Sequence, residues 1–499
     1  RIYVNHHRQE LFKLNRYIIL SLLDATKFLA RQSLSFRAEI ESEGNFNQMV
    51  SLLRRHNNTV DKWYNDTSTR SYQVTYLSND AQNEFISILG KAVHDSIINR
   101  LNKSLFWSTV VDSTPDISHK DMMSIIVRFV DEDGEAEKRL LYIIKIETKT
   151  GKNIGDNMLQ IFAKLDLDTN KLTGQSYDGA MNMSGAFKGV QTIISESTGR
   201  EIIFVPCCAH RSNKIVEPST QNSLEATKFF DLCNKIYVFI TGSTKCWAVL
   251  RDIYSNSMND DTLSLKKSTD TRWSSHYNSI IAIYESFTGI IQVLDELCDD
   301  NDKTTKFEAN AIHENLDILL AIDTLTKTIC LLNKIRNDED SINNLLELAK
   351  ERMINYDVDA DVEFDDFRIE DAEQIKIIVP GINSSDLLYY NVQLLKENLQ
   401  ECSSIKNIMS LFLKNNYKCL YPRLYRVYTF ILTLPVTVAS NERTSSRLKL
   451  IKNHLRSKIF DDRLMNLLLC SSEKDVLDSL NLDELVTVWR TKAKRRLSI

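Results

Sequence analysis

Phe106-Trp107-Ser108-Thr109-Val110-Val111-Asp112 is a run of aromatic and β-branched residues that ends on an acid. Residues of these types favour strands, so the run predicts a β-strand that closes at Asp112. Two more β-rich runs follow at 123–130 and 139–146, separated by the turn sequence Asp131-Glu132-Asp133-Gly134. The stretch therefore predicts three consecutive strands, the first with a carboxylate at its end.

A second aspartate closes another short β-rich run. An amphipathic helix follows the third strand, with an apolar face made by Met158, Ile161, Phe162 and Leu165. A fourth strand is predicted to end at Asp178, and 201–205 reads as a fifth. The order βββαβ(α)β is that of an α/β, ribonuclease H-like core, in which a helical crossover places the fourth strand beside the first. Neighbouring strand ends would bring Asp112 and Asp178 together.

The third candidate carboxylate is Glu442, in a basic segment with a helical pattern. Three carboxylates from separate elements can hold two divalent cations about 3.5–4 Å apart, which suits phosphodiester cleavage and strand transfer. Arg443 beside Glu442 suits a nearby phosphate. The alternative for each acid is a solvated strand end or helix cap. The alternative for the helix is an exposed basic face (Arg443, Arg447, Lys449, Lys452, Arg456, Lys458) opposite a buried stripe of Leu448, Ile451 and Leu455.

Two shorter motifs lie between Asp178 and Glu442. Cys207 and His210 are three residues apart and could supply half of a zinc site. No second Cys/His pair follows at finger spacing, so a buried cysteine and a locally hydrogen-bonded histidine are the alternatives. In Arg272-Trp273 the indole could stack on an unpaired base while the guanidinium holds a phosphate, although core packing is the more frequent use of a tryptophan.

Composition limits the class of protein. The chain has 499 residues, 43% of them hydrophobic and 26% charged, so two or three globular domains are expected. The net charge of −5 does not by itself indicate nucleic-acid binding, for which local basic patches matter more. No apolar stretch is long enough to span a membrane. Nine irregularly spaced cysteines favour a reducing compartment. The basic tail 492–496 suits a nuclear-import signal.

The pattern along the chain predicts four regions. Residues 1–105 are helical, 106–211 form the first part of the α/β core, 212–430 are helical again, and 431–499 hold the Glu442 helix and further helices. The run Leu464, Leu467, Leu468 and Leu469 is expected to bury against another helix or a second subunit. The sequence starts at Arg1 without a methionine, which is typical of a fragment.

Several segments together resemble the hAT (hobo–Activator type) transposase superfamily, most closely its transposase-derived members of the zinc finger MYM-type 1-like group. The segments 28–32, 43–46 and 78–84 resemble the start of an uncharacterised domain of those proteins. Ser176-Tyr177-Asp178-Gly179-Ala180-Met181-Asn182-Met183-Ser184-Gly185 is a long match. So is 434–446, which resembles the C-terminal dimerisation segment. The resemblance covers nearly the whole chain.

The resemblance implies a ribonuclease H-like core interrupted by a large all-α insertion domain at 212–430, a helical N-terminal region, and self-association through 431–499. It places Asp112, Asp178 and Glu442 on the family's catalytic triad, which binds two Mg²⁺ or Mn²⁺ ions. Cys207 and His210 match its Cys-x-x-His element, and Trp273 its Arg-Trp element near the DNA hairpin formed during excision. The family's N-terminal zinc-binding DNA-recognition module is not found in this sequence.

Three functions are therefore weighed. The first is a nuclear, dimerising DNA transposase that cleaves and joins DNA at transposon ends with metal ions. The second is a domesticated, catalytically silent dimerising nuclear regulator, whose structure could be the same. The third is a purely helical scaffold, which requires the strands between 106 and 205 to be absent.

Overall fold

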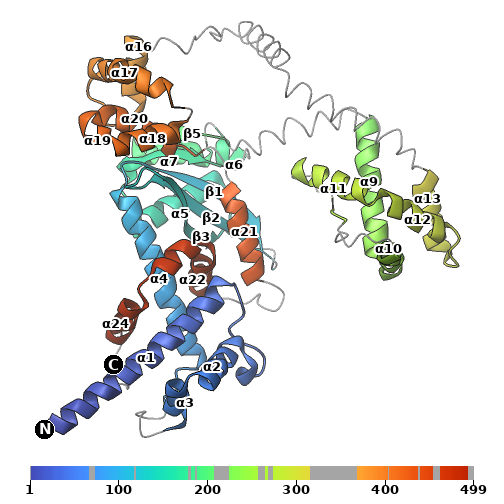
Figure 1. Cartoon of the computed structure of the whole chain (residues 1–499). Helices are drawn as coiled ribbons and strands as arrows, with labels where there is room; N and C mark the ends of the chain where they lie inside the picture. The colour runs from blue at the N-terminus through green and yellow to red at the C-terminus, as the bar shows by residue number, and fades with distance from the viewer. Residues whose placement is uncertain are drawn as a thin grey trace. The chain divides into compact units, whose positions relative to one another are not determined.

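The computed structural model groups the chain into two compact units, one formed by Arg1–Ala209 with Phe367–Ile499 and the other by His210–Asp366. Figure 1 draws the described elements of both as ribbons. The described residues are 2–66, 74–116, 118, 120–177, 181–185, 188–206, 224–256, 265–267, 273–314, 368–402, 404–435, 439–452 and 461–492. Each unit is treated by itself below.

The first unit is built around a five-stranded mixed sheet. Its strands are β1 (Trp107–Pro115), β2 (Asp121–Val130), β3 (Ala136–Lys145), β4 (Leu172–Ser176) and β5 (Ile203–Phe204). They lie in the order β3-β2-β1-β4-β5 (Figure 1). β1, β2 and β3 form an antiparallel meander, and β4 runs parallel to β1. The strand order predicted for a ribonuclease H-like core is confirmed, so the purely helical alternative is excluded.

The hairpin between β2 and β3 uses the predicted turn. Gly134 adopts φ +76°, a left-handed conformation that glycine takes at no steric penalty. The Asp131 N–H donates to the Glu135 carbonyl over 3.0 Å, which closes the turn. The crossover from β3 to β4 contains α5 (Gly151–Lys164), whose Met158, Ile161 and Phe162 are buried as the amphipathic pattern predicts.

Helices cover both faces of the sheet. The side chains of β1 alternate between the faces, as those of any strand do. On one face, Trp107 and Val111 join a core with α5 and with α7 (Val190–Thr198). On the other face, Val110 joins a core with α4 (Asn79–Lys103) and α22 (Asp461–Ser472). The second face is also the face of Asp112 and Thr114, because both positions are even-numbered on β1.

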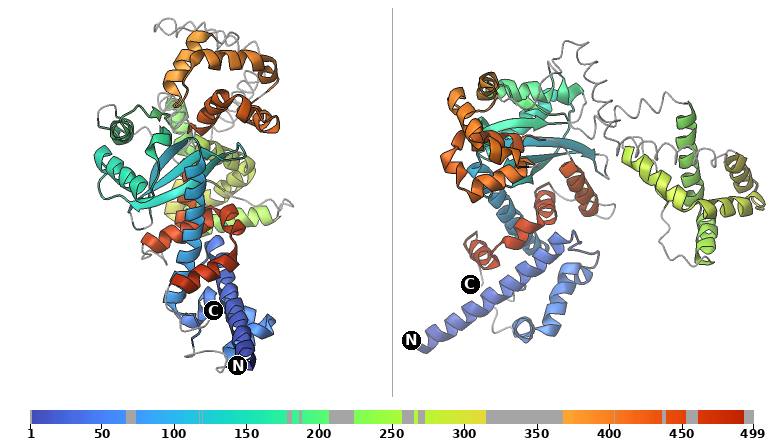
Figure 2. Two further views of the ribbon diagram at one scale, coloured as in Figure 1. Left: turned by 90° about the vertical axis from the view of Figure 1, so that its left-hand side faces the viewer. Right: turned by 45° about the horizontal axis from the view of Figure 1, so that its top comes forward.

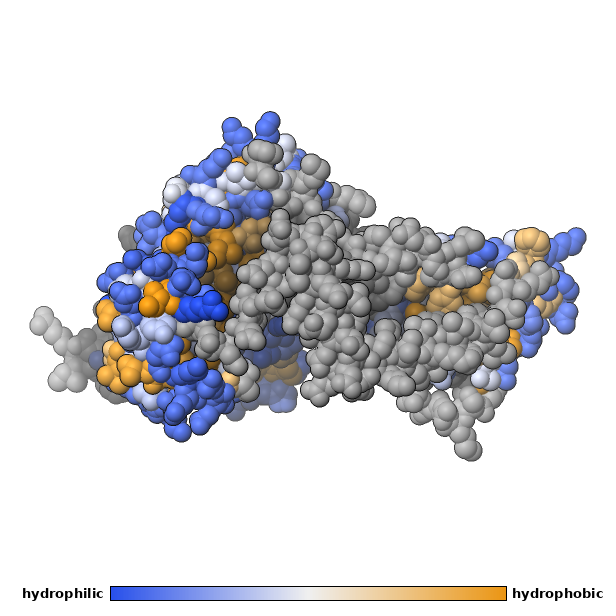
Figure 3. Space-filling model, turned by 90° about the horizontal axis from the view of Figure 1, so that it is seen from above, coloured by the Kyte–Doolittle hydropathy of each residue, from blue (hydrophilic) through white to orange (hydrophobic). Residues whose placement is uncertain are grey.

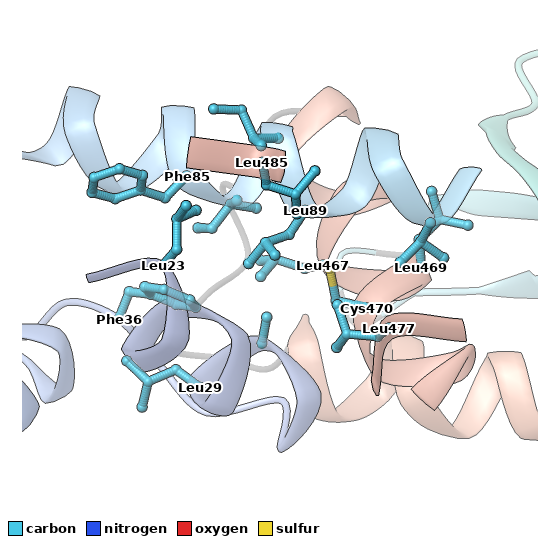
Figure 4. Packing of buried hydrophobic residues seen from close by; sticks show 14 of the residues in the cluster. Leu23, Leu29, Phe36, Phe85, Leu89, Leu467, Leu469, Cys470, Leu477 and Leu485 are labelled. Carbon is cyan, nitrogen blue, oxygen red and sulfur yellow. The ribbon is translucent and has the colours of Figure 1, made fainter. Parts of the chain in front are cut away.

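Both ends of the chain contribute to the core that contains Val110. The N-terminal part holds α1 (Ile2–Arg31), α2 (Asn45–His56) and α3 (Asn58–Asn65), and the C-terminal part holds α23 (Lys474–Ser479) and α24 (Leu482–Lys492). Blue and red helices lie beside one another in each view of Figure 2. Figure 4 shows Leu23 and Leu29 from α1, Phe85 and Leu89 from α4, and Leu467 and Leu469 from α22 in one apolar cluster. Arg31 on α1 pairs with Asp478 on α23 over 2.9 Å.

The expected burial of the leucine run on α22 takes place within this chain. Leu464, Leu467, Leu468 and Leu469 are all buried in the core that α4 and α1 complete. A fully buried leucine stabilises a fold by roughly 1.5–3 kcal/mol, so these side chains contribute mainly to the stability of the unit itself. Of the two expected partners, the run uses another helix of its own chain.

A further helical layer packs against the sheet through Phe106 and Val130. It contains α16 (Ile369–Ile378), α17 (Ser385–Gln400), α18 (Ile405–Lys414), α19 (Tyr417–Leu420) and α20 (Pro422–Thr433). The sequence pattern had grouped these helices with the 212–430 region, whereas the second unit ends at Asp366. That second unit contains a separate apolar core from α9 (Leu224–Gly242), α10 (Thr244–Asn256), α11 (Trp273–Glu285), α12 (Phe287–Cys298) and α13 (Lys303–Glu314).

Candidate catalytic site on the ribonuclease H-like core

Asp112 lies near the end of β1, where the strand leaves the apolar core. The five residues before it, from Trp107 to Val111, are buried, and Asp112 itself is half-buried. Its backbone carbonyl accepts a hydrogen bond from Ser124 Oγ at 3.3 Å, on the neighbouring strand β2. A carboxylate at the boundary between core and solvent is held by the sheet and can still be reached by a ligand.

The end of β4 is fixed by a buried polar chain. Gln175 Nε2 donates to the carbonyl oxygens of Gln191 and Ile202, and Gln175 Oε1 accepts from the Tyr177 hydroxyl at 2.9 Å. Tyr177 is fully buried, and burial raises the pKa of its phenol well above its ordinary value. The phenol therefore stays neutral and keeps donating. Asp178, the next residue, lies outside the described residues.

The structure gives the register of the parallel strands β1 and β4 up to Ser176. β1 and β4 pair through Val110 and Ser176, the last pair that the structure gives. Asp112 and Asp178 each follow that pair by two residues in the sequence. The backbone thus places the known end of β4 beside the part of β1 that leads into Asp112.

The helix that contains Glu442 is attached to the same face of β1. α21 (Ala439–Ile451) includes Glu442, whose side chain is not among those described. Thr114 Oγ1 and Ser445 Oγ are 2.7 Å apart and share a hydrogen bond. Glu442 lies one helical turn before Ser445, and Asp112 lies two residues before Thr114.

A buried ion pair makes the second attachment. Lys452, just after α21, donates from Nζ to Asp116 Oδ2, just after β1, and both side chains are almost fully buried. Asp116 Oδ1 also accepts from the backbone N–H groups of Ser118 and Lys120 at 2.7 and 2.9 Å. Burial alone would raise the pKa of Asp116, but the Lys452 ammonium and the two N–H groups hold it below its ordinary value.

These two attachments also give the direction of α21. The later helix residue Lys452 meets the later strand residue Asp116, so α21 runs in the same sense as β1. Three residues before Ser445, about 4.5 Å back along the helix axis, lies Glu442. Two residues before Thr114, about 6.7 Å back along the strand, lies Asp112. The turn of Glu442 and the strand position of Asp112 are therefore neighbours in the backbone.

The chain that leads into α21 is held on the same face of the sheet. Ser108 Oγ donates to the Thr433 carbonyl at 2.6 Å, and Arg128 Nε donates to the Leu432 carbonyl at 2.7 Å. Pro435 rests on β4 at Gly174, where an added Cβ would come within 2.8 Å of the proline ring. The C-terminal end of α20 and the body of α21 thus lie on either side of Asp112 along β1.

Two family models match the chain. The ZMYM1/FAM200, RNase-like domain matches residues 1–189, which include β1 to β4, Asp112 and Asp178. The hAT family C-terminal dimerisation region matches residues 392–476, which include α21 and Glu442. This chain is a hAT-family transposase-like protein. The two matched regions are the two parts that the Thr114–Ser445 and Asp116–Lys452 contacts join, so the core of this hAT protein is assembled from both ends of the sequence.

Of the other predicted site residues of the hAT protein, few are described. Arg443 is exposed on α21, and its phosphate contact stays a prediction. Trp273 is the first residue of α11 in the second unit, and its side chain is not described. Arg272, Cys207 and His210 lie outside the described residues. Among the described side chains, no three from His, Cys, Asp or Glu gather as a metal site would need. Asp112 is the one predicted triad member whose side chain is described.

The contacts that fix α21 were not predicted from the sequence, and one residue of the helix differs from its expected place. Lys452 was expected on an exposed basic face, and it is buried. Leu448 and Ile451 are buried as expected, whereas Leu455 lies outside the described residues. The signal was present, because Lys452 follows Leu448 by four residues and so lies on the same helix face as the apolar stripe. No helix in the described part is long and apolar enough to cross a membrane.

Proposed function

We propose that this hAT-family protein acts in the nucleus as a metal-dependent DNA transposase, with Asp112, Asp178 and Glu442 as the ligands of two Mg²⁺ or Mn²⁺ ions. The observation that carries the proposal is the double attachment of α21 to β1, at Thr114 and at Asp116, which makes Glu442 the backbone neighbour of Asp112. If the register of β1 and β4 continues for two residues beyond Ser176, Asp178 stands beside Asp112 as the third ligand.

The available residues suit these ions. Mg²⁺ and Mn²⁺ prefer oxygen ligands, and all three candidates are carboxylates. Asp112 is half-buried at a strand end that hydrogen bonds hold in place, which is the support that a metal ligand needs. Bound in pairs, such ions activate a nucleophile and stabilise both oxygens of an in-line displacement at phosphorus.

The residues around the site also suit a DNA backbone. Arg443 and Lys449 are exposed on α21, and Arg447 is half-buried. Cations on the helix that carries Glu442 would bind phosphates next to the metal ligands. Arg272 and Trp273 are proposed to hold an unpaired base, since cleavage through a hairpin needs a displaced nucleotide.

The experiment is nicking of supercoiled plasmid and of labelled duplex by the purified chain in Mn²⁺ and in Mg²⁺. Cleavage should fall more than about 100-fold in Asp112→Asn, Asp178→Ala and Glu442→Gln, because carboxylates that bind metal act as one unit. Asp121→Asn is the matched control. Asp121 lies at the same end of the sheet but pairs with Pro115, on the face opposite to Asp112.

Two outcomes would count against the proposal. Cleavage that survives Asp178→Ala would remove the triad assignment. A chain that binds DNA but never cleaves it in either metal would favour the dimerising nuclear regulator.

A further inference from the structure

An apolar stripe runs along the outer side of α17. Leu387, Tyr390 and Leu394 are 48%, 60% and 72% exposed. Their spacings of three, four and seven residues place them on one face of the helix. Another side of α17, about 100° around the helix axis, buries Leu388 and Leu395 in the core of the helical layer. α17 is therefore apolar on two sides, and its own fold covers one of them.

The preceding helix also ends in exposed apolar side chains. Ile377 and Ile378, the last two residues of α16, are 77% and 50% exposed. A short turn with Gly381 at φ +82° leads from α16 into α17, whose first turns hold Leu387. We call Ile377, Ile378, Leu387, Tyr390 and Leu394 the α16–α17 face. Seen from above, the unit that contains it shows orange apolar patches between hydrophilic residues (Figure 3).

The grouping of exposed apolar side chains on α16 and α17 is unusual for the molecule. Of the twenty large apolar side chains that are exposed among the described residues, six lie on α16 and α17. Single exposed apolar residues are normal on any protein surface, but grouped ones mark a binding surface. Two exposed isoleucines beside a leucine–tyrosine–leucine stripe thus indicate a partner.

The dimerisation region identifies that partner. It matches 392–476, yet its most apolar segment, the leucine run of α22, is buried in the core of the same chain. The α22 leucines are therefore not available to a second copy, and we look for the contact among the other apolar side chains. Among the described residues of the match, the exposed large apolar ones are Leu394 at 72%, Leu420 at 65%, Leu450 at 55% and Ile431 at 39%. Leu394 is the most exposed of them and the one that continues into a stripe.

We propose that the α16–α17 face is the surface on which a second copy of this chain docks. A twofold dimer brings the same patch of each subunit together, which suits a helix stripe that can pack against its own copy. Tyr390 and Leu394 form the centre, since central aromatic and apolar side chains contribute most to binding. The exposed Glu397 and Asn398 on the next turn supply part of a polar rim.

The test is sedimentation velocity of the full chain over a range of concentrations, without DNA or metal, so its result is independent of the proposed cleavage. The wild-type protein should show a concentration-dependent dimer. The double variant Tyr390→Lys/Leu394→Lys should raise the dissociation constant at least about 100-fold, because four ammonium groups would meet in the interface. Leu387→Lys, at the other end of the stripe, should weaken the dimer in the same direction.

Leu420→Lys is the matched control, since Leu420 is similarly exposed in the same helical layer and in the matched region but lies outside the α16–α17 face. It should leave the dimer unchanged. All these side chains are exposed, so the variants should retain the wild-type circular dichroism and melting temperature. A wild-type chain that stays monomeric, a folded double variant that dimerises normally, or dissociation by Leu420→Lys would each overturn the proposal.

Discussion

Replacing Lys452 by methionine should detach α21 from the sheet. Methionine keeps the aliphatic volume of the lysine stem but removes the ammonium group that pairs with Asp116. The Asp116 carboxylate then stays buried with two backbone N–H partners and no cation. Removing one partner of a buried ion pair destabilises a protein by about 3–5 kcal/mol, and the two remaining N–H bonds favour the lower end, about 3 kcal/mol.

Amide hydrogen exchange followed by mass spectrometry measures this effect where it occurs. A loss of about 3 kcal/mol in the free energy of opening corresponds to about 100-fold faster exchange, since each 1.4 kcal/mol is tenfold. The increase should appear in the last turns of α21 and spare the hairpin at Asp131–Gly134. Lys449→Met is the matched control, because Lys449 is exposed on the same helix. Equal exchange in both variants would refute the role given to the buried pair.

Two further predictions concern the contacts that hold α21 and the chain leading into it on the sheet. Because the folded-state pKa of Asp116 lies below its ordinary value of 3.8, its carboxylate stabilises the fold fully above that pH and loses this effect as pH falls through the lower folded value. Melting temperatures measured from pH 6 to pH 3 should therefore fall less steeply in Asp116→Asn than in wild type, and parallel curves would contradict this. Gly174→Ala should lower stability by about 1–3 kcal/mol in urea titrations, because the new methyl group would meet Pro435 at 2.8 Å. Gly242→Ala, where no atom lies within 4 Å, is the control, and equal effects of the two changes would count against the contact.

The strands and their order were predictable because local chemistry decides them. The run from Phe106 to Val111 consists largely of residues that favour strands, and Gly134 supplies the left-handed conformation that the hairpin turn needs. The first strand was predicted to end at Asp112, whereas β1 continues to Pro115. Asp112 on β1 and Asp178, two residues after β4 in the sequence, still indicate one edge of the sheet. The resemblance to hAT proteins, carried by the segments around Asp178 and Glu442, is confirmed by the two family models.

Contacts between distant segments were not predictable in the same way. The helices from 369 to 433 have apolar faces that would fit either unit. Their contact with Phe106 and Val130 assigns them to the first unit. The leucine run of α22 was equally suited to another helix and to a second subunit, since both are apolar surfaces. The pairing of Asp116 with Lys452 joins residues more than 300 positions apart, and a single sequence gives no signal for it.

The central claim is that residues from the two matched regions form one metal site. Isothermal titration of the wild-type chain with Mn²⁺ tests it without DNA. We expect binding in the wild type, loss of at least one ion in Asp112→Asn, the same loss in Glu442→Gln, and no additional loss when both changes are combined, because the two carboxylates would share the ions. If Glu442→Gln binds Mn²⁺ as the wild type does, Glu442 is not a ligand and the shared site does not exist.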